Sequence, residues 1–490
     1  MSRINTNVAS LIAQHKLARS NESMAVRLQR LSTGLRINRG ADDPAGLIVS
    51  ERLRSELKGL TQAIDNSERA SSVISTTEGY LAEVADLLNS ISALIVNSAN
   101  TGGVSKEEIA ANQLQIDSAI ESITRISNTG SFAGLQLLNG SLAYVTSGIA
   151  SSALTGVTVH GVQFGTNDTV PVAVEVIQSA QTGRLFLSAI SGALVSSVTL
   201  EIAGNTGVQT MSFVSGTPLS AVVAAVNTVR DTTGVSAYLD VPSNQTSGMW
   251  FNSATFGSDA FVSVRRIGSS FPSFQTFLAS GGTATQRDTG RDVGAIVNGA
   301  LATGDGTRVS LNSPSLALDL DLSVSFATLV NGTASNFNIT AGGATFQLGP
   351  ALTTTQQVGI GIQSVAASRV GGTTTTTGRF FLESIKSGQP NSLLAGRTRE
   401  ANAILNNAIT EISSMRGRLG AFERNTLQTN ARSLQIGLEN IMASESKIRD
   451  ADFAVETAAL SRAQILQQAG TSVLATANAS AQGVLRLLQQ

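Results

Sequence analysis

The residue types that carry most enzyme and metal chemistry are nearly absent from this chain. Its 490 residues include no cysteine and only two histidines, His15 and His160, which lie far apart. Thiol nucleophiles, disulfides and cysteine metal sites are therefore excluded, and imidazole chemistry has little raw material. Neither histidine lies in an HExxH pattern, and no GxxxxGK[ST] phosphate loop occurs. We expect no enzyme activity, no cofactor and no resident metal.

The carboxylates of the sequence LALDLDLSV offer a weaker candidate site. Asp319 and Asp321 alternate there with leucines, and carboxylates are the ligands that Ca²⁺ prefers. Alternation is also the pattern of a half-buried strand, whose polar positions face solvent, and we favour this interpretation. We interpret Trp250 as a packing residue of a small core, and His15 as a packing residue of a terminal helix.

Composition bears on two classes of partner. The formal net charge is −1 and charged residues make up 14% of the chain, so we expect no nucleic-acid partner and no membrane partner. No continuous run of about 18 apolar residues occurs. The N-terminal sequence MSRINTNVASLIAQHKL lacks the apolar core of a secretory signal peptide, which on its own favours the cytoplasm.

The elements at the two ends of the chain predict paired helices. Asp450 and Asp452 can cap the first turn of a helix, after which apolar or small residues recur at helical spacing. These residues are Leu466, Gly470, Val473, Ala477, Ala481, Val484 and Leu488. Such a lean face needs a partner, and residues 3–35 show the same period on a polar background. We therefore expect the two ends to pack together.

Next to these ends the sequence predicts a helical rod. Asp43 and Pro44 mark the start of a helix that should run to about Ser98. Its apolar seven-residue repeat is typical of a coiled coil, with Ser67 as the polar exception. The repeat consists of Leu53, Leu60, Ile74, Leu81, Leu88 and Ile95, and on the C-terminal side of Leu405, Ile412, Leu434 and Ile441. A change of phase near Gly420 indicates a local adjustment of the coil.

Shorter signals complete the rod. Ser105 and Glu108 predict a capping box, on a helix that should end near Asn128 and fold back on the long helix. Residues 132–142 contain Asn139 followed by Gly140, which predicts a β-hairpin turn.

The middle of the chain predicts β-structure. Short alternating runs at 157–163, 195–202, 261–264 and 316–324 read as strands, and 219–229 as a helix. The Gly- and Thr-rich run 371–378 is typical of a linker. We expect a multi-domain α + β fold, in which a long antiparallel helical coiled-coil bundle is built from both termini and β-rich outer domains are inserted. The expected divisions are 1–43 and 450–490 for the terminal helices, 44–142 and 391–449 for the rod, and 143–285 and 286–390 for the β-rich modules.

Both ends resemble bacterial flagellin. The runs INTNVASLIAQHKL and LQRLSTGLRINRGADDPAGLIVSERLRSELKGL are similar to the N-terminal signature of that family, and SESKIRDADFAVETAALSRAQILQQAGTSVLATANASAQGVLRLL to its C-terminal signature. The resemblance covers about residues 1–140 and 393–490, in the right order. A weaker resemblance, over about 195–266, is to the insertion module of some flagellins and hook-associated proteins.

The resemblance implies a structural subunit that polymerises into the extracellular bacterial flagellar filament for swimming motility, exported without a cleaved signal. It implies as partners further copies of the chain, an export chaperone on the C-terminal helix, and filament cap and hook-associated proteins. Identical subunits in a non-closing contact form a helical filament. The filament-core residues would be Val8, Leu11, Ile12, Leu28, Leu31, Ile465, Leu466, Leu474, Val484, Leu485 and Leu488. An ordinary monomer core would use the same residues.

Two other functions remain open from the sequence. A hook–filament junction protein shares similar ends, and a secreted adhesin could use the helices as a stalk for a ligand-binding middle. The SKIRDAD and QILQQAG runs and the large middle favour a flagellin.

The resemblance also exposes a departure. Flagellins seen by the Toll-like receptor present an Arg- and Glu-bearing face of the pattern QRVRELAV on the long helix. The matching stretch is NSISALIV, residues 89–96. Its receptor-face positions are Asn89, Ser90, Ile91, Ser92, Ala93 and Leu94, which lack the charges but keep apolar residues. We therefore expect weak or absent receptor activation.

Overall fold

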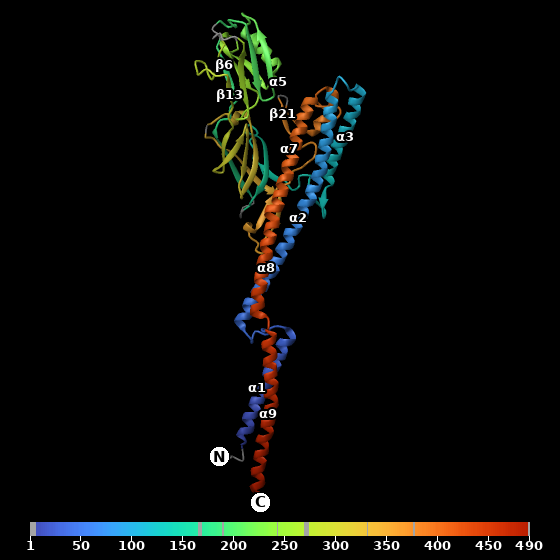
Figure 1. Cartoon of the computed structure of the whole chain (residues 1–490), viewed down its shortest axis with the longest axis vertical. Helices are drawn as coiled ribbons and strands as arrows, with labels where there is room; N and C mark the ends of the chain where they lie inside the picture. The colour runs from blue at the N-terminus through green and yellow to red at the C-terminus, as the bar shows by residue number, and fades with distance from the viewer. Residues whose placement is uncertain are drawn as a thin grey trace. The chain divides into compact units, whose positions relative to one another are not determined.

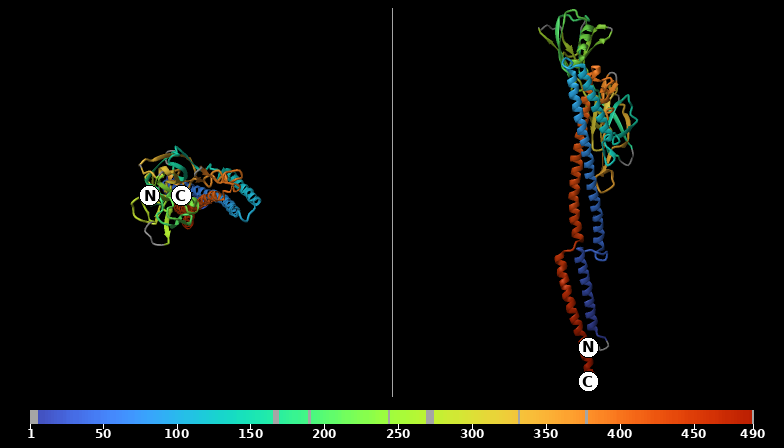
Figure 2. Two further views of the ribbon diagram at one scale, coloured as in Figure 1. Left: turned by 90° about the horizontal axis from the view of Figure 1, so that it is seen from above. Right: turned by 90° about the vertical axis from the view of Figure 1, so that its right-hand side faces the viewer.

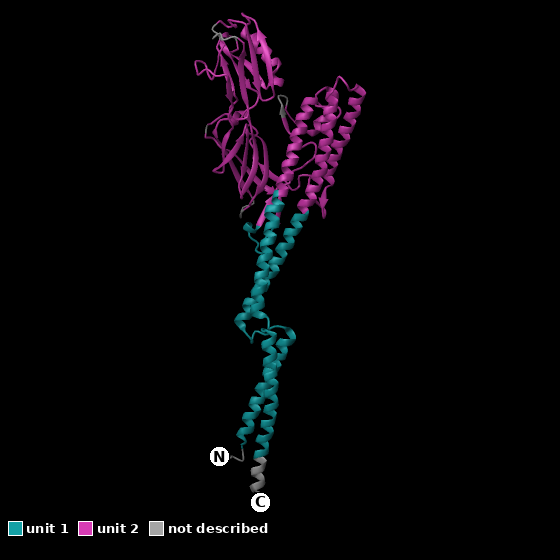
Figure 3. Ribbon diagram, viewed as in Figure 1, with its two compact units in different colours: residues 1–72, 347–356, 421–490 teal, residues 73–346, 357–420 magenta. Residues whose placement is uncertain are grey.

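The computed structural model describes residues 6–164, 169–188, 191–242, 244–268, 274–330, 332–375 and 378–488. It divides into two compact units (Figure 3). Unit 1 comprises Met1–Ser72, Gln347–Gln356 and Ala421–Gln490, and unit 2 comprises Val73–Phe346 and Gln357–Gly420. Long helices come from both ends of the sequence and the β-rich parts from its middle (Figure 1).

The terminal helices pair antiparallel, as the sequence predicts. Helix α1 (Val8–Thr33) lies beside α9 (Phe453–Leu488) in the views of Figures 1 and 2. Gly34 ends α1 with a φ of 72°, a left-handed conformation that favours glycine. Asp452 caps α9, because its Oδ1 accepts the backbone N–H groups of Ala454 at 2.9 Å and Val455 at 3.1 Å.

A second antiparallel pair occupies the rest of unit 1. Helix α2 (Pro44–Ala99) begins at the predicted proline, and its first part packs against α8 (Gln428–Arg449). Arg449 Nη1 lies 3.0 Å from Glu51 Oε1, and the Asn430 side chain donates to Ser67 Oγ at 3.4 Å. Because the contacts later along α2 are made earlier along α8, the two helices run in opposite directions.

Unit 2 continues the helical part with the rest of α2, α3 (Lys106–Thr129) and α7 (Thr398–Phe422). The predicted capping box of Ser105 and Glu108 is present at the start of α3. Between α7 and α8 lies a π-helical turn, Glu423–Leu427. A π-turn inserts one residue into a helix, which accounts for the one-residue change of phase that the sequence predicts near Gly420.

The predicted hairpin at 132–142 has its turn elsewhere. Strands β1 (Ser131–Phe132) and β2 (Leu135–Gln136) pair around Ala133 and Gly134, whose φ angles are 50° and 86°. The chain does turn at Asn139 and Gly140, where Asn139 Oδ1 accepts the Ser141 N–H at 2.9 Å and Gly140 has a φ of 95°, but the prediction that this turn closes the hairpin is wrong. Leu137 and Leu138 are consecutive and both fully buried, so the chain before Asn139 cannot alternate faces as a strand does.

An eight-stranded antiparallel sheet forms the first β-structure of unit 2. Its order is β3-β18-β5-β14-β15-β16-β17-β4. The strands are β3 (Tyr144–Ser147), β4 (Leu154–Val162), β5 (Val170–Gln178), β14 (Gly294–Val297), β15 (Ala300–Asp305), β16 (Arg308–Asn312), β17 (Leu316–Leu322) and β18 (Ser335–Gly342). The Tyr144 hydroxyl accepts the Val162 backbone N–H at 3.2 Å, so the two outermost strands contact each other around a buried apolar core. The short helix α6 (Val324–Ala327) follows β17.

Two four-stranded sheets form the second β-structure, in the orders β12-β6-β10-β9 and β13-β11-β7-β8. The strands are β6 (Arg184–Leu187), β7 (Val198–Gly204), β8 (Val208–Phe213), β9 (Val235–Val241), β10 (Asn244–Ser253), β11 (Phe261–Ile267), β12 (Thr276–Phe277) and β13 (Arg287–Thr289). The predicted helix is α4 (Leu219–Thr228), which shares the core of these sheets and is followed by α5 (Arg230–Thr233).

The strand pairing does not follow the expected boundary between the two β-rich modules, which lies between residues 285 and 286. Strands β3–β5 precede that boundary, yet β3 pairs with β18, β4 with β17, and β5 with β14 and β18, all beyond it. The two four-stranded sheets come from the sequence between β5 and β14, which are neighbours in the eight-stranded sheet. An insertion between neighbouring strands leaves their pairing intact.

Two further predictions are corrected in the middle. The run 371–378 contains β21 (Thr373–Thr375), which pairs with β22 (Gly378–Phe380), so its ends form a short hairpin rather than a free linker. Trp250 does not belong to the module core: it is half-buried, and its Nε1 donates to Asp240 Oδ1 at 2.8 Å. Its cross-strand partner Phe186 points to the same face, whereas the flanking Met249 and Phe251 supply the core.

The remaining elements are short. Strands β19 (Ala344–Gln347) and β20 (Gln357–Ile360) pair with each other, with the 3₁₀ turn η1 (Thr354–Gln356) between them. Two more 3₁₀ turns, η2 (Leu382–Ile385) and η3 (Leu393–Ala395), precede α7. One 18-residue window of α2 reaches a mean hydropathy of 1.3, enough by length and composition for a membrane span. That window is 28% buried. Since Ile74, Leu81 and Leu88 on the seven-residue repeat of α2 are fully buried, we interpret α2 as a helix of the bundle.

Candidate assembly interface

The α1–α9 pair leaves many of its large apolar side chains exposed. The residues buried between the helices are small or polar and include Ser10, Ala13 and Ala463. The large residues are exposed, as shown by the exposed fractions of 67% for Ile465, 55% for Leu466 and 55% for Val8. Leu11, Ile12 and Leu28 are likewise about half exposed. Concentrated apolar exposure of this kind marks a protein–protein contact.

The seam itself is held largely by hydrogen bonds. The Asn7 side chain donates to Ala477 O at 3.0 Å, and Ser20 Oγ donates to Ala463 O at 3.1 Å. Gly470 lies against Leu17, where an added Cβ would approach Leu17 Cδ1 to 3.2 Å. Small residues thus bring the two backbones close, as the sequence predicts, and no large apolar side chain in the described part of the pair is fully buried.

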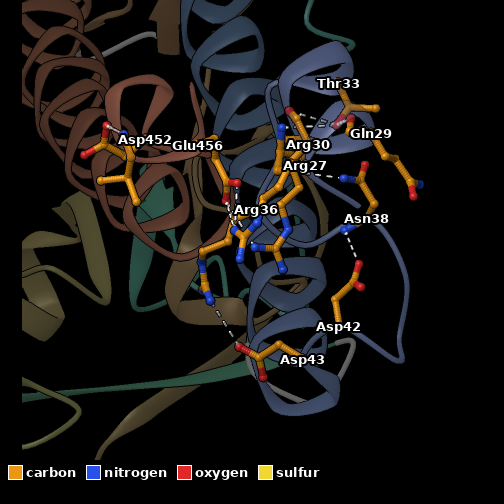
Figure 4. A network of polar contacts seen from close by, with 12 residues as sticks. Arg27, Gln29, Arg30, Thr33, Arg36, Asn38, Asp42, Asp43, Asp452 and Glu456 are labelled. Atoms are coloured by element: carbon orange, nitrogen blue, oxygen red, sulfur yellow. Dashed lines mark hydrogen bonds and ion pairs between the residues drawn. The ribbon is translucent and has the colours of Figure 1, made fainter. Parts of the chain in front are cut away.

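An ion-pair cluster fixes one end of the seam (Figure 4). Glu456 of α9 is 4% exposed and accepts from Arg27 Nη1 at 2.9 and 2.7 Å and from Arg30 Nη1 at 3.1 Å. Burial alone would raise the pKa of Glu456, but the hydrogen bonds from Arg27 and Arg30 outweigh it and lower the pKa. Glu456 is therefore a buried anion that orders two cations of α1.

The segments that leave the terminal pair are also joined. Leu35 and Asp450 form an isolated antiparallel bridge, supported by Arg36 N–H to Arg449 O at 2.7 Å and by Ala451 N–H to Gly34 O at 2.9 Å. Asp42 closes the loop after α1, and hydrogen bonds from the backbone of Arg39 and Asn38 lower its pKa (Figure 4). These bonds set the direction in which the segments around Leu35 and Asp450 enter the terminal pair.

A groove of about 610 Å³ lies along the same two helices. Its walls include the small residues Ala459, Ala469 and Gly470, and its cations are Lys16, Arg19, Arg27 and Arg462. The terminal pair thus combines exposed apolar groups with a basic groove. This combination suits packing against another protein surface better than contact with water alone.

The predicted filament-core residues fall into groups. Val8, Leu11, Ile12, Leu28, Ile465 and Leu466 are exposed, whereas Leu31 and Leu474 are half-buried. Val484, Leu485 and Leu488 lie in the last turns of α9, where side chains are outside the described part of the structure. His15 is exposed, so it does not pack within the α1–α9 pair; the buried residue of that turn is Ala13.

The predicted rod residues are mostly buried. Leu60, Ile74, Leu81, Leu88, Ile95, Leu405 and Ile412 are buried, and Leu53, Leu434 and Ile441 are half-buried. Sequence reasoning missed other exposed apolar side chains, which lie off the seven-residue repeat. They are Ile48 and Val49 on α2, Ile436 and Met442 on α8, and Phe453 and Val455 on α9. Their sequence signal is an apolar residue at a position outside the seven-residue repeat, where the coiled coil does not bury it.

The receptor-face stretch differs from its prediction at one position. Ile91 is 0% exposed, because its side chain faces the bundle of unit 2, so it cannot serve as an apolar contact for a receptor. Asn89, Ser90 and Ala93 are exposed, and Ser92 and Leu94 are half-buried. The accessible positions of the stretch, which also include Val96, therefore carry no charge.

The alternating carboxylates of β17 are engaged by basic residues. Asp319 lies 3.0 Å from His160 Nε2, and Asp321 Oδ1 lies 3.0 Å from Arg308 Nε. Burial would raise the pKa of Asp319, but His160 lowers it. Both are half-buried rather than open to solvent, and no group of three or more His, Asp or Glu that could hold a metal occurs within the described ranges.

Comparison with known families decides what this arrangement belongs to. The family described as "Bacterial flagellin N-terminal helical region" matches residues 4–143, and "Bacterial flagellin C-terminal helical region" matches 403–488. A flagellin of Salmonella rubislaw is 30% identical over 99% of both chains, and the B-type flagellin of Pseudomonas aeruginosa is 30% identical over 99% of both chains. This chain belongs to the bacterial flagellin family. It is a structural subunit of the extracellular flagellar filament and polymerises with copies of itself.

The flagellin also matches the "Flagellin hook IN motif" at residues 199–248, within the two four-stranded sheets. Among solved structures, flagellar hook associated protein-3 of Legionella pneumophila is similar with 12% identity and a TM-score of 0.30, over 81% of this chain and 98% of that one. The D2-D3 domains of the flagellar cap protein FliD of Escherichia coli have 16% identity and a TM-score of 0.27, over 40% of this chain and 97% of that one. Neither score defines the fold of this flagellin.

Proposed function

We propose that the α1–α9 pair is the element through which this flagellin polymerises, and that its exposed apolar residues form the filament core. The observation that carries the proposal is the exposure of Val8, Leu11, Ile12, Leu28, Ile465 and Leu466 on one helix pair. Completing the burial of one such half-exposed side chain is favourable by about 1 kcal/mol. A contact with several of them can therefore hold a polymer together. We place Leu31 and Leu474 at its edge and extend it to Val484, Leu485 and Leu488.

The lean seam supports a link between folding and assembly. Since small and polar residues fill the space between α1 and α9, the isolated pair gains little from apolar burial. A neighbouring copy would supply that burial. We therefore propose that the pair reaches full stability only in the filament.

The same exposure supports a chaperone before export. The start of α9 exposes Phe453 and Val455, and its middle exposes Ile465 and Leu466, a surface that would cause premature association unless covered. We propose that an export chaperone binds the C-terminal helix there. Filament cap and hook-associated proteins would meet the same terminal helices at the two ends of the polymer.

The division of labour along the chain follows. We propose that 1–43 and 450–490 form the filament core, that 44–142 and 391–449 form the helical rod around it, and that 143–285 and 286–390 face outward. The similarity to flagellins, at 30% identity, extends over 99% of the chain. It supports a filament subunit over a hook–filament junction protein or a stalked adhesin.

The test is seeded polymerisation, followed by sedimentation and negative-stain microscopy. The intact chain should form long filaments on added filament fragments, whereas a chain ending at Asp452 should stay in the supernatant. A matched control, Leu301→Ser, changes an exposed leucine of β15 in unit 2 and should polymerise like the parent. Polymerisation of the truncated chain at the parent's critical concentration would show that assembly does not depend on α9.

A further inference from the structure

A loop from the middle of the sequence belongs to the helical unit. Residues Gln347–Gln356 cluster with α1, the first part of α2, α8 and α9 in unit 1. The Asn66 side chain of α2 donates to Gln347 O at 3.3 Å, and the Asn430 side chain of α8 donates to Leu348 O at 2.7 Å. Leu348 is buried. The loop is thus anchored on both helices of the pair.

Pro350 of the loop packs directly against Gly59 of α2. A Cβ added at Gly59 would lie 2.9 Å from Pro350 Cβ, closer than real Cβ atoms come. The proline ring is rigid, so only a glycine at position 59 allows Pro350 to pack this close to α2. Gly59 therefore costs α2 some helix stability and in return admits the loop.

The loop is also fixed internally. The Gln347 side-chain amide donates to Gly349 O at 2.8 Å and to Ala351 O at 2.7 Å. Gln356 Oε1 accepts the Ala351 N–H at 2.7 Å, and Gln356 O accepts the Leu348 N–H at 2.8 Å. The conformation is set before any partner binds, which lowers the entropy cost of a later contact.

What this rigid loop presents is Leu352. Its exposed fraction is 88%, the highest among the exposed large apolar residues of the described chain. Single exposed leucines are common, but this one stands on a loop that α2 and α8 hold in place. The same unit also exposes Ile436 and Met442 on α8 and Ile48 on α2, so apolar exposure continues beyond the terminal pair.

We propose that the 347–356 loop is a second contact between subunits, in which Leu352 packs against a neighbouring copy of this flagellin in the filament. The inference rests on the proposed function, since it requires the polymer that the terminal helices build. A second copy is the occupant because this chain polymerises with itself, and because the loop shares a compact unit with the proposed assembly helices. The contact would link helical parts of adjacent subunits outside the filament core.

The chain contains no cysteine, which allows a direct test of burial by maleimide labelling. Three single-cysteine variants, Leu352→Cys, Ile465→Cys and Leu301→Cys, are labelled as monomers and as filaments. In filaments we expect labelling of Leu352→Cys and Ile465→Cys to slow at least tenfold, and that of Leu301→Cys on β15 to stay unchanged. Equal labelling of Leu352→Cys in both states, with Ile465→Cys protected, overturns the loop contact and leaves the proposed function intact. If Ile465→Cys also stays reactive, the proposed function falls, and the loop contact falls with it.

A second pair of variants tests the contact between Pro350 and Gly59 without changing Leu352. Gly59→Ala forces Pro350 to move, whereas Gly79→Ala, also on α2, meets nothing within 4 Å. Both changes favour helix formation, so neither should unfold α2. We expect the critical concentration for polymerisation to rise several-fold for Gly59→Ala only. Identical critical concentrations for the two variants contradict the proposal.

Discussion

Arg27 Nη1 lies 2.9 and 2.7 Å from the two carboxylate oxygens of Glu456, although the residues are 429 positions apart. This contact joins the first helix of the chain to the last one in a buried position. Breaking it leaves Arg27 and Arg30 without their anion.

Glu456→Gln should therefore weaken the α1–α9 pair. Glutamine keeps the shape and one acceptor oxygen but removes the charge that both arginines share. Hydrogen bonds to charged groups contribute about 1.5–3 kcal/mol, so we expect the critical concentration for polymerisation to rise by about tenfold or more. Glu22→Gln, on the exposed surface of α1, is the matched control. An unchanged critical concentration for Glu456→Gln would contradict a stabilising role.

Acid should dissociate the filament partly through the same residue. The pKa of Glu456 is below its ordinary value of 4.5, so its stabilising contribution is complete above pH 4.5 and is lost as the pH falls through the lowered pKa. Asp42 and Glu51 also have lowered pKa values and remain in the variant. We expect the pelleted fraction of the parent to fall more steeply below pH 4.5 than that of Glu456→Gln. Parallel curves would assign acid sensitivity to other groups.

The small residues of the terminal seam should not tolerate enlargement. Ala463 is buried between α1 and α9, and its carbonyl accepts the Ser20 hydroxyl. Ala463→Leu should separate the helices at a cost of about 1–3 kcal/mol, which calorimetry of the filament would record as a lower melting temperature. Ala458→Leu, at an exposed position of α9, should leave the melting temperature nearly unchanged. Equal effects of the two leucines would show that Ala463 does not lie in a tight seam.

Receptor activation should be weak. The accessible positions Asn89, Ser90 and Ala93 carry no charge, and Ile91 is buried. In a reporter-cell assay with monomeric protein, we expect a response far below that of a flagellin with the charged QRVRELAV face. A comparable response would mean that the receptor uses another surface of this chain.

The helical part of the fold was predictable because its signals are local. Pro44 after Asp43, the Ser105–Glu108 box and the Asp452 cap each act within a few residues. The polar exception Ser67 is satisfied locally, because its hydroxyl donates to Ala63 O at 2.9 Å within α2. It also accepts from the Asn430 side chain of α8 at 3.4 Å, a distant contact that no local pattern marks. The sequence predicts the polar interruption of the repeat, but not the residue of α8 that contacts it.

The β-rich middle could be predicted as strands but not as sheets. Strand β3 pairs with β18, and β5 pairs with β14 across the whole inserted module. Such pairing depends on contacts between distant segments, which alternation of side chains does not specify. For the same reason the sequence did not show that Pro350 reaches Gly59, since no local pattern marks a loop that leaves its sheet.

A helical reconstruction of the polymerised flagellin tests the central claim most directly. The account predicts that α1 and α9 line the innermost radius, and that Val8, Leu11, Ile465 and Leu466 contact neighbouring copies. A reconstruction in which these side chains face solvent, while the β-sheets make the contacts between subunits, would contradict it.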